Sequence, residues 1–96
     1  MKERDYQASL IRRLEQRYPG CFVMKNDSSY VQGVPDLTVL HNGMWAMLEV
    51  KVDENSHTQP NQKYYIDKFE RMSYAAFVHP ENEDVVLSEL DKHFER

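Results

Sequence analysis

The sequence predicts a single α/β (α+β) domain, in which a mixed central sheet is flanked by helices in the order α-β-β-β-α-β-α. One observation is an Asn-Gly pair at 42–43 between two apolar runs, which is the strongest short-range signal for a β-hairpin. The other is helical periodicity in three segments, over 3–18, 58–73 and after Asn82. Residues 45–79 form a strand-helix-strand unit, and the right-handed crossover of such a unit makes its two strands parallel if they are adjacent.

The first helix is predicted over residues 3–18, because large apolar side chains recur there at every fourth position: Tyr6, Leu10, Leu14 and Tyr18. Pro19 and Gly20 end it. The apolar run 21–25 predicts the first strand, and the polar run 26–32 predicts a loop that leads into the hairpin.

The hairpin is predicted over residues 33–51, and its two-residue turn determines the register. That register pairs His41 with Met44, Leu40 with Trp45, Thr38 with Met47 and Asp36 with Glu49. Side chains alternate between the two faces of a strand, so Lys51 points to the same face as Asp36 and Glu49. The hairpin therefore gathers two carboxylates and an ammonium group on one face.

Two carboxylates that face each other across an antiparallel pair destabilise the pair. A divalent cation between Asp36 and Glu49 removes this repulsion, and Mg²⁺ is often held by one or two carboxylates together with a substrate phosphate. The ammonium group of Lys51 suits a phosphate or an attacking hydroxide. The face therefore predicts a metal and phosphate site, and the alternative is a solvated polar face with an ordinary surface ion pair.

The second helix begins at Thr58 and Pro60, and its apolar side chains at i, i+4 and i+7 are predicted to be buried: Tyr65, Phe69 and Met72. Gln62 lies on the same face, where a polar group needs partners. A catalytic pocket would provide these partners, and the alternative is that the glutamine caps or braces the end of a strand. A strand at 75–79 and a last helix follow, with an apolar stripe on that helix: Val85, Val86, Leu87, Leu90 and Phe94.

Glu3 stands in the first turn of the helix over 3–18 and projects toward its packed face, one turn before Tyr6. A carboxylate in this place matches a third metal ligand. An acidic residue at a helix N-terminus is also favoured by the helix dipole alone. Both interpretations of Glu3 stay open.

Ninety-six residues with a net charge of −4 predict one domain and argue against a protein that coats nucleic acid, since such proteins are usually basic. The charge is uneven, because residues 1–25 carry +3 and the remainder −7. The single cysteine, Cys21, cannot form an internal disulfide bond. No apolar run approaches the length of a membrane span and the N-terminus is too polar for a signal peptide, so we expect a soluble intracellular protein.

Other chemistries lack the residues that they need. The four histidines have no metal-ligand spacing: His41, His57, His79 and His93. The groups that do converge are carboxylates, which do not favour zinc. The three glycines form no phosphate-binding loop, and no base is placed beside a serine or cysteine nucleophile. The expected cofactor is Mg²⁺ or Mn²⁺, with no small-molecule cofactor.

The hairpin residues resemble a known signature. A Pro-Asp pair at 35–36, twelve intervening residues and Glu-Val-Lys at 49–51 are similar to the PD-(D/E)XK nuclease motif. The Gly-Val pair at 33–34 and Gln62 in the later helix resemble the small VRR-NUC and Holliday-junction-resolvase-like branch, which includes stand-alone phage nucleases. The order of elements extends the resemblance over most of the chain.

The resemblance implies a restriction-endonuclease-like fold and a metal-dependent endonuclease that hydrolyses DNA phosphodiester bonds. Asp36 and Glu49 then bind Mg²⁺ or Mn²⁺, and the Val50 carbonyl supplies a further ligand. Lys51 orients or deprotonates the attacking water or neutralises the phosphate, and Gln62 belongs to the catalytic group. In the same scheme the carboxylate of Glu3 holds a second metal ion or its water shell.

The resemblance also implies contacts and partners. A basic residue and a serine precede the Pro-Asp pair in the related resolvases, which matches Lys25 with Ser28 or Ser29 as contacts to the DNA backbone. The basic segment 1–25 adds Arg12 and Arg13 as candidate phosphate contacts.

The implied substrate is branched DNA such as a Holliday junction, cut in the cytoplasm of a bacterial host by a phage-encoded protein. Cutting two strands needs two active sites, so a homodimer is expected, with the last helix's apolar residues as one candidate interface. The alternative is a non-catalytic nucleic-acid or protein-binding module that keeps the fold.

Overall fold

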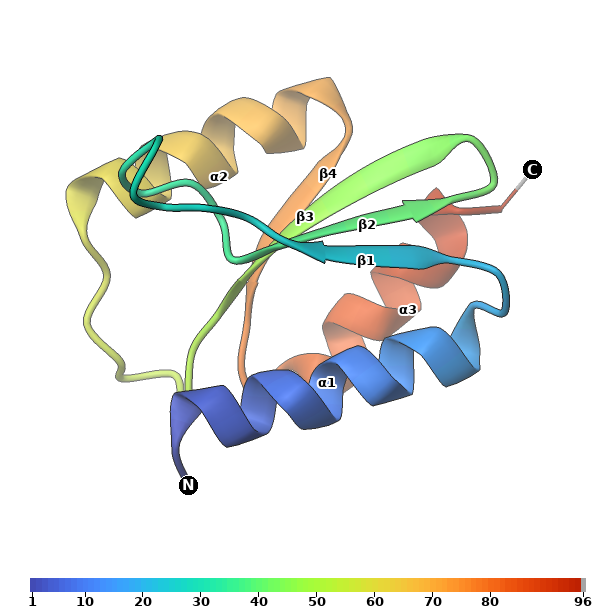
Figure 1. Ribbon diagram of the computed structural model, residues 1–96, viewed down its shortest axis with the longest axis horizontal. Helices are drawn as coiled ribbons and strands as arrows, with labels where there is room; N and C mark the ends of the chain where they lie inside the picture. Colours follow the sequence, from blue (N-terminus) through green and yellow to red (C-terminus); the bar gives the residue numbers. More distant parts are fainter. Residues whose placement is uncertain (96) are drawn as a thin grey trace.

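Four strands form one mixed sheet in the computed structural model, which describes residues 1–95 (Figure 1). In sheet order they are β1 (Phe22–Lys25), β2 (Leu37–His41), β3 (Met44–Val50) and β4 (Tyr74–Val78). Strands β1, β2 and β3 pair antiparallel, whereas β3 and β4 pair in parallel. The predicted order of elements and the parallel pairing across the second helix are both confirmed.

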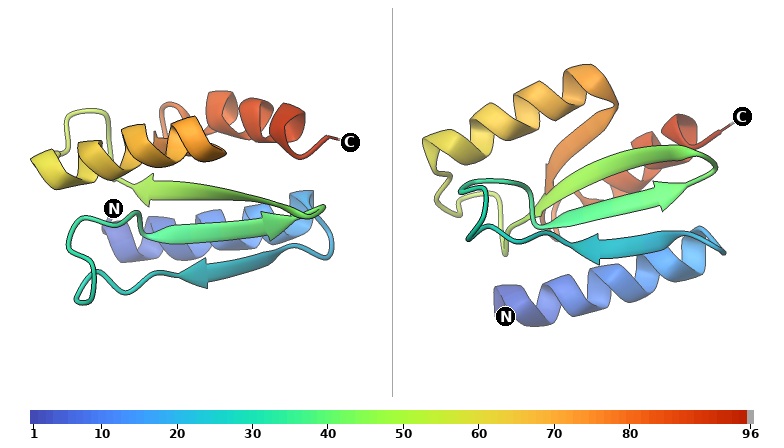
Figure 2. Two further views of the ribbon diagram at one scale, coloured as in Figure 1. Left: turned by 90° about the horizontal axis from the view of Figure 1, so that it is seen from above. Right: turned by 45° about the horizontal axis from the view of Figure 1, so that its top comes forward.

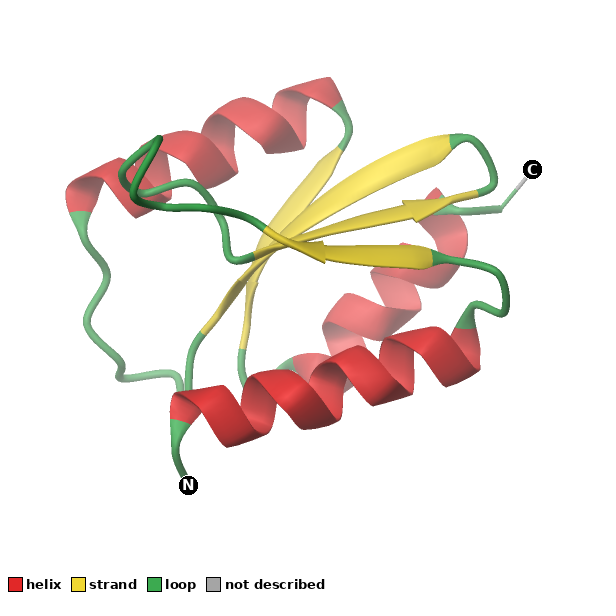
Figure 3. Cartoon of the chain, viewed as in Figure 1, coloured by secondary structure: helices red, strands yellow, loops and turns green. Residues whose placement is uncertain are grey.

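Three helices complete the fold: α1 (Glu3–Arg17), α2 (Pro60–Met72) and α3 (Glu83–His93). Helix α2 covers one face of the sheet, and α1 and α3 lie against the other (Figures 2 and 3). The predicted bounds are correct to within two residues. Helix α1 ends one residue earlier than predicted, because Tyr18 leaves the helical conformation with φ −121° and ψ 76°.

The β2–β3 hairpin has the predicted turn and register. Asn42 and Gly43 take positive φ values of 54° and 75°, as the two central residues of a type I′ turn must. The predicted pairs that lie within the two strands are all present: His41 with Met44, Leu40 with Trp45, and Thr38 with Met47. The Asn42 side-chain amide also donates to the carbonyl oxygen of Phe94 at 2.9 Å, so the turn is tied to the end of α3.

The main core lies between the sheet and helices α1 and α3. The sheet contributes alternate, fully buried side chains: Leu37, Val39, Ala46, Leu48, Val50 and Val78. The apolar stripe of α3 packs into the same core, with Val86, Leu87, Leu90 and Phe94 all buried. These four side chains are therefore used in the chain's own core, and Val85, at 60% exposed, is the member of the stripe that an interface could still use.

Helix α2 packs on the other face through a stripe that is rotated from the predicted one. Ile66 is buried, and the Phe69 ring meets the Trp45 ring edge-on with centroids 6.0 Å apart. Met72 was predicted to be buried but is 64% exposed, because the inward stripe runs through residues 62, 66 and 69. None of the helices in residues 1–95 combines the length and apolarity needed to cross a membrane.

Candidate functional site

Asp36 is held rigidly just before β2. Its Oδ2 accepts a hydrogen bond from the Val50 backbone N–H at 2.8 Å, which joins the two ends of the hairpin. The Asn26 N–H donates to the Asp36 carbonyl at 2.8 Å, and the Asn26 side chain donates to the Pro35 carbonyl at 2.9 Å. Thr38 in turn donates to Asn26 Oδ1 at 3.0 Å. Asn26 therefore fixes the backbone at Asp36, a role that its place in a polar loop did not predict.

Glu49 is 4% exposed near the end of β3. Leu37 pairs with Leu48, so Asp36 and Glu49 are neighbours at the next position of the hairpin, as predicted. Burial first, and then the charge of Asp36, raise the pKa of Glu49 to about 7, although Lys51 acts in the opposite direction. Burial likewise raises the pKa of Asp36. The two carboxylates are in an environment that disfavours carrying both charges.

Lys51 is buried directly after β3, and its backbone N–H donates to the Val78 carbonyl at 2.9 Å. Its Nζ donates to the His57 carbonyl and to Gln62 Oε1, both at 2.9 Å, and lies 3.7 Å from Glu49 Oε2. An ammonium group has three N–H donors, and the His57 and Gln62 oxygens use two of them. Lys51 is therefore a positioned charge beside Glu49.

Gln62 connects the lysine and the glutamate. Its Nε2 donates to Glu49 Oε2 at 2.9 Å, and its Oε1 accepts from Lys51 Nζ at 2.9 Å and from the Gln59 N–H at 3.0 Å. Because an ammonium group only donates, the amide oxygen must face Lys51 and the nitrogen must face Glu49. The prediction that Gln62 points inward is confirmed, and the polar partners that it needs are these two side chains.

A cavity of about 520 Å³ opens above the two carboxylates. Its described lining comes from the loop after β1 and from the start of α2: Ser28, Ser29, Gln32, Gly33, Val34, Asp36, Glu49, Gln59, Asn61 and Gln62. Ser28 and Ser29, two of the predicted DNA contacts, thus share a cavity with the carboxylates. Asn61 and Gln59 are additional candidates, which no pattern in the sequence singled out.

The remaining predicted residues lie outside that cavity lining. Lys25 is exposed at the end of β1, paired with Leu37. Arg12 is exposed and contacts Ser9 on its own helix. Arg13 makes a two-pronged ion pair with Glu83 at 2.6 and 2.7 Å, which directs its guanidinium toward α3. The structure therefore does not gather these three cations around the carboxylates.

Glu3 lies at the same end of the sheet as the site. Its pKa is raised by partial burial and then by Asp36, whereas Lys51 lowers it. Within residues 1–95, however, no three His, Cys, Asp or Glu side chains are grouped closely enough to form a ready metal-binding cluster. The charge of Glu3 contributes to the raised pKa of Glu49, so Glu3 interacts electrostatically with the carboxylate pair, and its role as a third ligand stays a prediction.

The donor set nevertheless fits a hard divalent cation. The half-buried carboxylate of Asp36 and the buried carboxylate of Glu49 lie side by side, and Mg²⁺ commonly uses one or two carboxylates while it keeps several waters. Burial and the charge of Asp36 raise the pKa of Glu49 in spite of Lys51, and a bound cation would favour the ionised form of both carboxylates. The pair and the Val50 carbonyl are the residues that would hold the ion.

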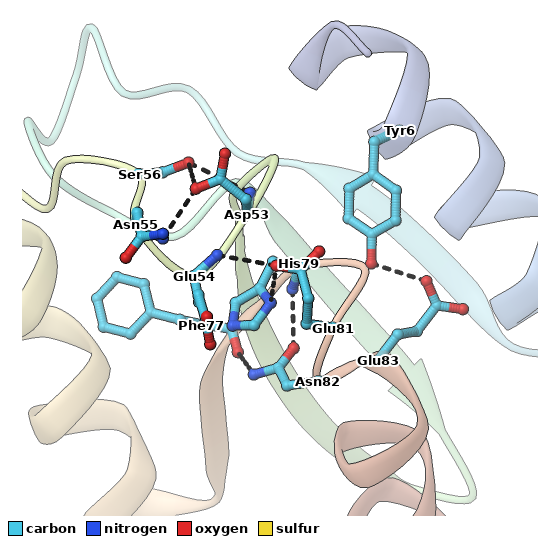
Figure 4. A network of polar contacts seen from close by, with 10 residues as sticks. All are labelled: Tyr6, Asp53, Glu54, Asn55, Ser56, Phe77, His79, Glu81, Asn82 and Glu83. Carbon is cyan, nitrogen blue, oxygen red and sulfur yellow. Dashed lines mark hydrogen bonds and ion pairs between the residues drawn. The ribbon is translucent and has the colours of Figure 1, made fainter.

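The segment between Lys51 and α2 is anchored on the β4–α3 turn (Figure 4). The Glu54 N–H donates to Glu81 Oε1 at 3.0 Å, and His79 Nδ1 lies 3.3 Å from the same oxygen. Asn82 accepts from the His79 N–H at 2.8 Å. These contacts hold the loop that presents the His57 carbonyl to Lys51. The sequence contained no signal for this anchor, because its partners are about 27 residues apart in the chain.

Comparison of the chain with protein-family models, with curated proteins and with solved structures finds no match. Asp36, Glu49, Lys51 and Gln62 form the centre of the site.

Proposed function

We propose that this protein is a divalent-metal-dependent endonuclease that hydrolyses DNA phosphodiester bonds on a restriction-endonuclease-like fold. One observation carries the proposal. Gln62 bridges Glu49 and Lys51 by two hydrogen bonds of 2.9 Å, and the half-buried carboxylate of Asp36 lies beside Glu49 in the same cavity. This is the set of groups that metal-assisted phosphodiester hydrolysis uses, namely oxygen ligands, a positioned cation and room for a phosphate.

A purely structural role explains the cluster less well. Burying charged groups costs free energy, and apolar side chains of similar volume often stabilise a fold better than a buried ion pair does. Here Glu49 is 4% exposed and Lys51 is 8% exposed, and the pKa of Glu49 is raised to about 7. Perturbed ionisable groups that share a cavity are typical of functional sites.

A bound Mg²⁺ or Mn²⁺ would supply Lewis-acid stabilisation of the phosphate and a lowered pKa of its water. Asp36, Glu49 and the Val50 carbonyl would hold the ion. Lys51 is positioned to orient the attacking water or to neutralise the scissile phosphate, since its Nζ lies 3.7 Å from Glu49 Oε2. Gln62 keeps Lys51 and Glu49 at this spacing, so its role is to position both groups.

For the substrate we propose branched DNA, such as a four-way junction. The motif resembles that of junction-resolving nucleases, and the chain has a single such site, which cuts one strand at a time. Symmetric cutting of a junction then requires two copies of the chain, so the proposal includes a homodimer.

A second candidate function is that of a non-catalytic binding module. One observation favours it. Phe22, Met24 and Leu40 are 60%, 40% and 40% exposed on the sheet face beside α2, where a macromolecular partner can bury them. In that case the protein binds DNA or another protein without a metal ion, and the carboxylates have no chemical role.

A cleavage assay separates the two functions. Labelled four-way junction, flap, nicked and plain duplex DNA are incubated with the protein, with and without Mg²⁺ or Mn²⁺. We expect metal-dependent cleavage that falls at least about 100-fold in Asp36→Asn and in Lys51→Met. Lys63→Met is the matched control, because Lys63 is an exposed lysine on α2 that pairs with Asp67.

The results of this assay distinguish a nuclease from a binding module. If Asp36→Asn and Lys51→Met cut as well as the parent protein, the nuclease proposal is wrong. If no substrate is cut in any metal and DNA is still bound in a chelator, the binding module is the better account. Circular dichroism of each variant excludes loss of the fold as the reason for lost cleavage.

A further inference from the structure

The cavity above Asp36 and Glu49 has two distinct walls. One wall is the loop between β1 and β2, and the other is the first turn of α2, which lies beside that loop in Figure 1. The Asn61 side-chain amide donates to the Gln32 carbonyl at 3.2 Å and joins the two walls. The carboxylates are therefore reached from a recess and do not lie on an open surface.

The close approach of the walls depends on a glycine. Gly33 has φ +91°, and a Cβ placed on it would lie 2.6 Å from Cγ of Asn61. A side chain at position 33 would force either the loop or the Asn61 side chain to shift, since contacts shorter than 3.0 Å are not tolerated. The shape of the recess therefore depends on the absence of a side chain at Gly33.

The upper walls are neutral and polar. Apart from Gly33 and Val34, they carry hydroxyl and amide side chains: Ser28, Ser29, Gln32, Gln59 and Asn61. Among the described residues of the lining there is no lysine or arginine. Amides and hydroxyls both donate and accept hydrogen bonds, as the edges of nucleobases do.

We infer that the recess receives one unpaired nucleotide next to the scissile phosphate, with its base against Gln32 and Asn61. The inference rests on the proposed nuclease function and specifies the DNA that the site takes. A volume of about 520 Å³ accommodates a group of mononucleotide size. A base that is already unpaired enters such a pocket at the smallest cost in lost stacking and pairing. The site therefore selects DNA at a bulge or branch point.

The test compares two duplexes that differ in one base. One carries a single unpaired 2-aminopurine, and the other carries the same base paired with thymine. Affinity is measured by fluorescence anisotropy in Ca²⁺, which takes the same oxygen ligands as Mg²⁺. We expect at least tenfold tighter binding of the unpaired duplex, together with a change in 2-aminopurine fluorescence. Equal affinity for the two duplexes overturns the inference.

Variants assign the preference to the recess. The double variant Gln32→Ala/Asn61→Ala is expected to lose the tenfold preference, and Gln16→Ala, an exposed glutamine on α1, is expected to keep it. Gln32→Ala alone is a safeguard for folding, because the Gln32 backbone carbonyl, and not its side chain, bonds to Asn61. A folded Gln32→Ala variant should lose part of the preference for the unpaired base. If Gln32→Ala and Gln32→Ala/Asn61→Ala both keep the full preference, the inference is overturned.

A parallel cleavage assay in Mg²⁺ separates this inference from the function on which it rests. If DNA is cut but the unpaired nucleotide gives no advantage, the inference fails and the nuclease proposal stands. If no DNA is cut but the preference exists and depends on Gln32, the nuclease proposal fails and the nucleotide pocket stands.

Discussion

The side-chain amide of Gln62 donates to Glu49 Oε2 at 2.9 Å, and this contact joins α2 to the buried end of β3. The oxygen of the same amide accepts from Lys51 at 2.9 Å. One neutral residue thereby sets the distance between a carboxylate and an ammonium group that both lie beneath the cavity. Loss of this amide should affect both charged groups together.

We expect Gln62→Ala to lower the free energy of unfolding by about 1–3 kcal/mol, because it leaves buried donors and acceptors on Glu49 and Lys51 without a partner. Urea denaturation measures the change. The exposed Gln16 is the control, since Gln16→Ala should change stability by about 0.5 kcal/mol or less. Equal effects at the two positions would show that the Gln62 bridge does not stabilise the fold.

Stability should depend on pH through Glu49. Burial and Asp36 raise the pKa of Glu49 from 4.5 to about 7 in the folded protein, so the folded state binds this proton more tightly than the unfolded chain does. The stabilisation is complete below pH 4.5 and is lost as the pH rises through 7. In a chelator the free energy of unfolding should therefore fall by on the order of 3 kcal/mol over this range.

Thermal and urea unfolding at pH 5 and pH 8 measure that fall. Glu49→Gln removes the titrating group and should flatten the profile, whereas an unchanged profile would rule out Glu49 as its source. Added Mg²⁺ should raise the melting temperature at pH 8 more than at pH 5, because a metal ion binds the deprotonated carboxylates.

Gly33→Ala should be more destabilising than Gly20→Ala. Both glycines have positive φ values, of +91° and +86°, so both substitutions carry a similar backbone cost of about 1 kcal/mol. A Cβ at Gly20 meets nothing within 4 Å, whereas a Cβ at Gly33 meets Asn61. Equilibrium unfolding of the two variants should differ by about 1 kcal/mol or more. Equal losses would mean that the loop moves away from α2 without cost.

Lys25 and Arg13 should differ in how they affect DNA binding. Lys25 is exposed beside the strand that begins after Asp36, so Lys25→Ala should lower the slope of log affinity against log salt by about 1. Arg13 is engaged by Glu83, so Arg13→Ala should leave this slope unchanged and lower stability by about 1 kcal/mol or less. A salt titration of binding measures the slopes. A reduced slope in Arg13→Ala would show that DNA displaces Glu83.

The hairpin could be predicted from the sequence because its determinants are local. Asn42 and Gly43 adopt the positive φ values of a type I′ turn, and a two-residue turn leaves one register. That register alone places Asp36 beside Glu49 and directs Lys51 to the same face. The inward position of Gln62 followed from helical periodicity for the same reason.

Tertiary packing determines which residues surround the hairpin and Gln62. Arg13 is paired with Glu83, which lies 70 residues away, and the loop with Ser28 and Ser29 lies against Asn61 because Gly33 has no side chain. Met72 is exposed because α2 is rotated about its axis to suit the sheet. Short-range geometry along the chain is enough to bring the carboxylate pair, the lysine and the glutamine together. Only the packed structure formed the recess above them, because packing between distant segments depends on shapes that no local pattern encodes.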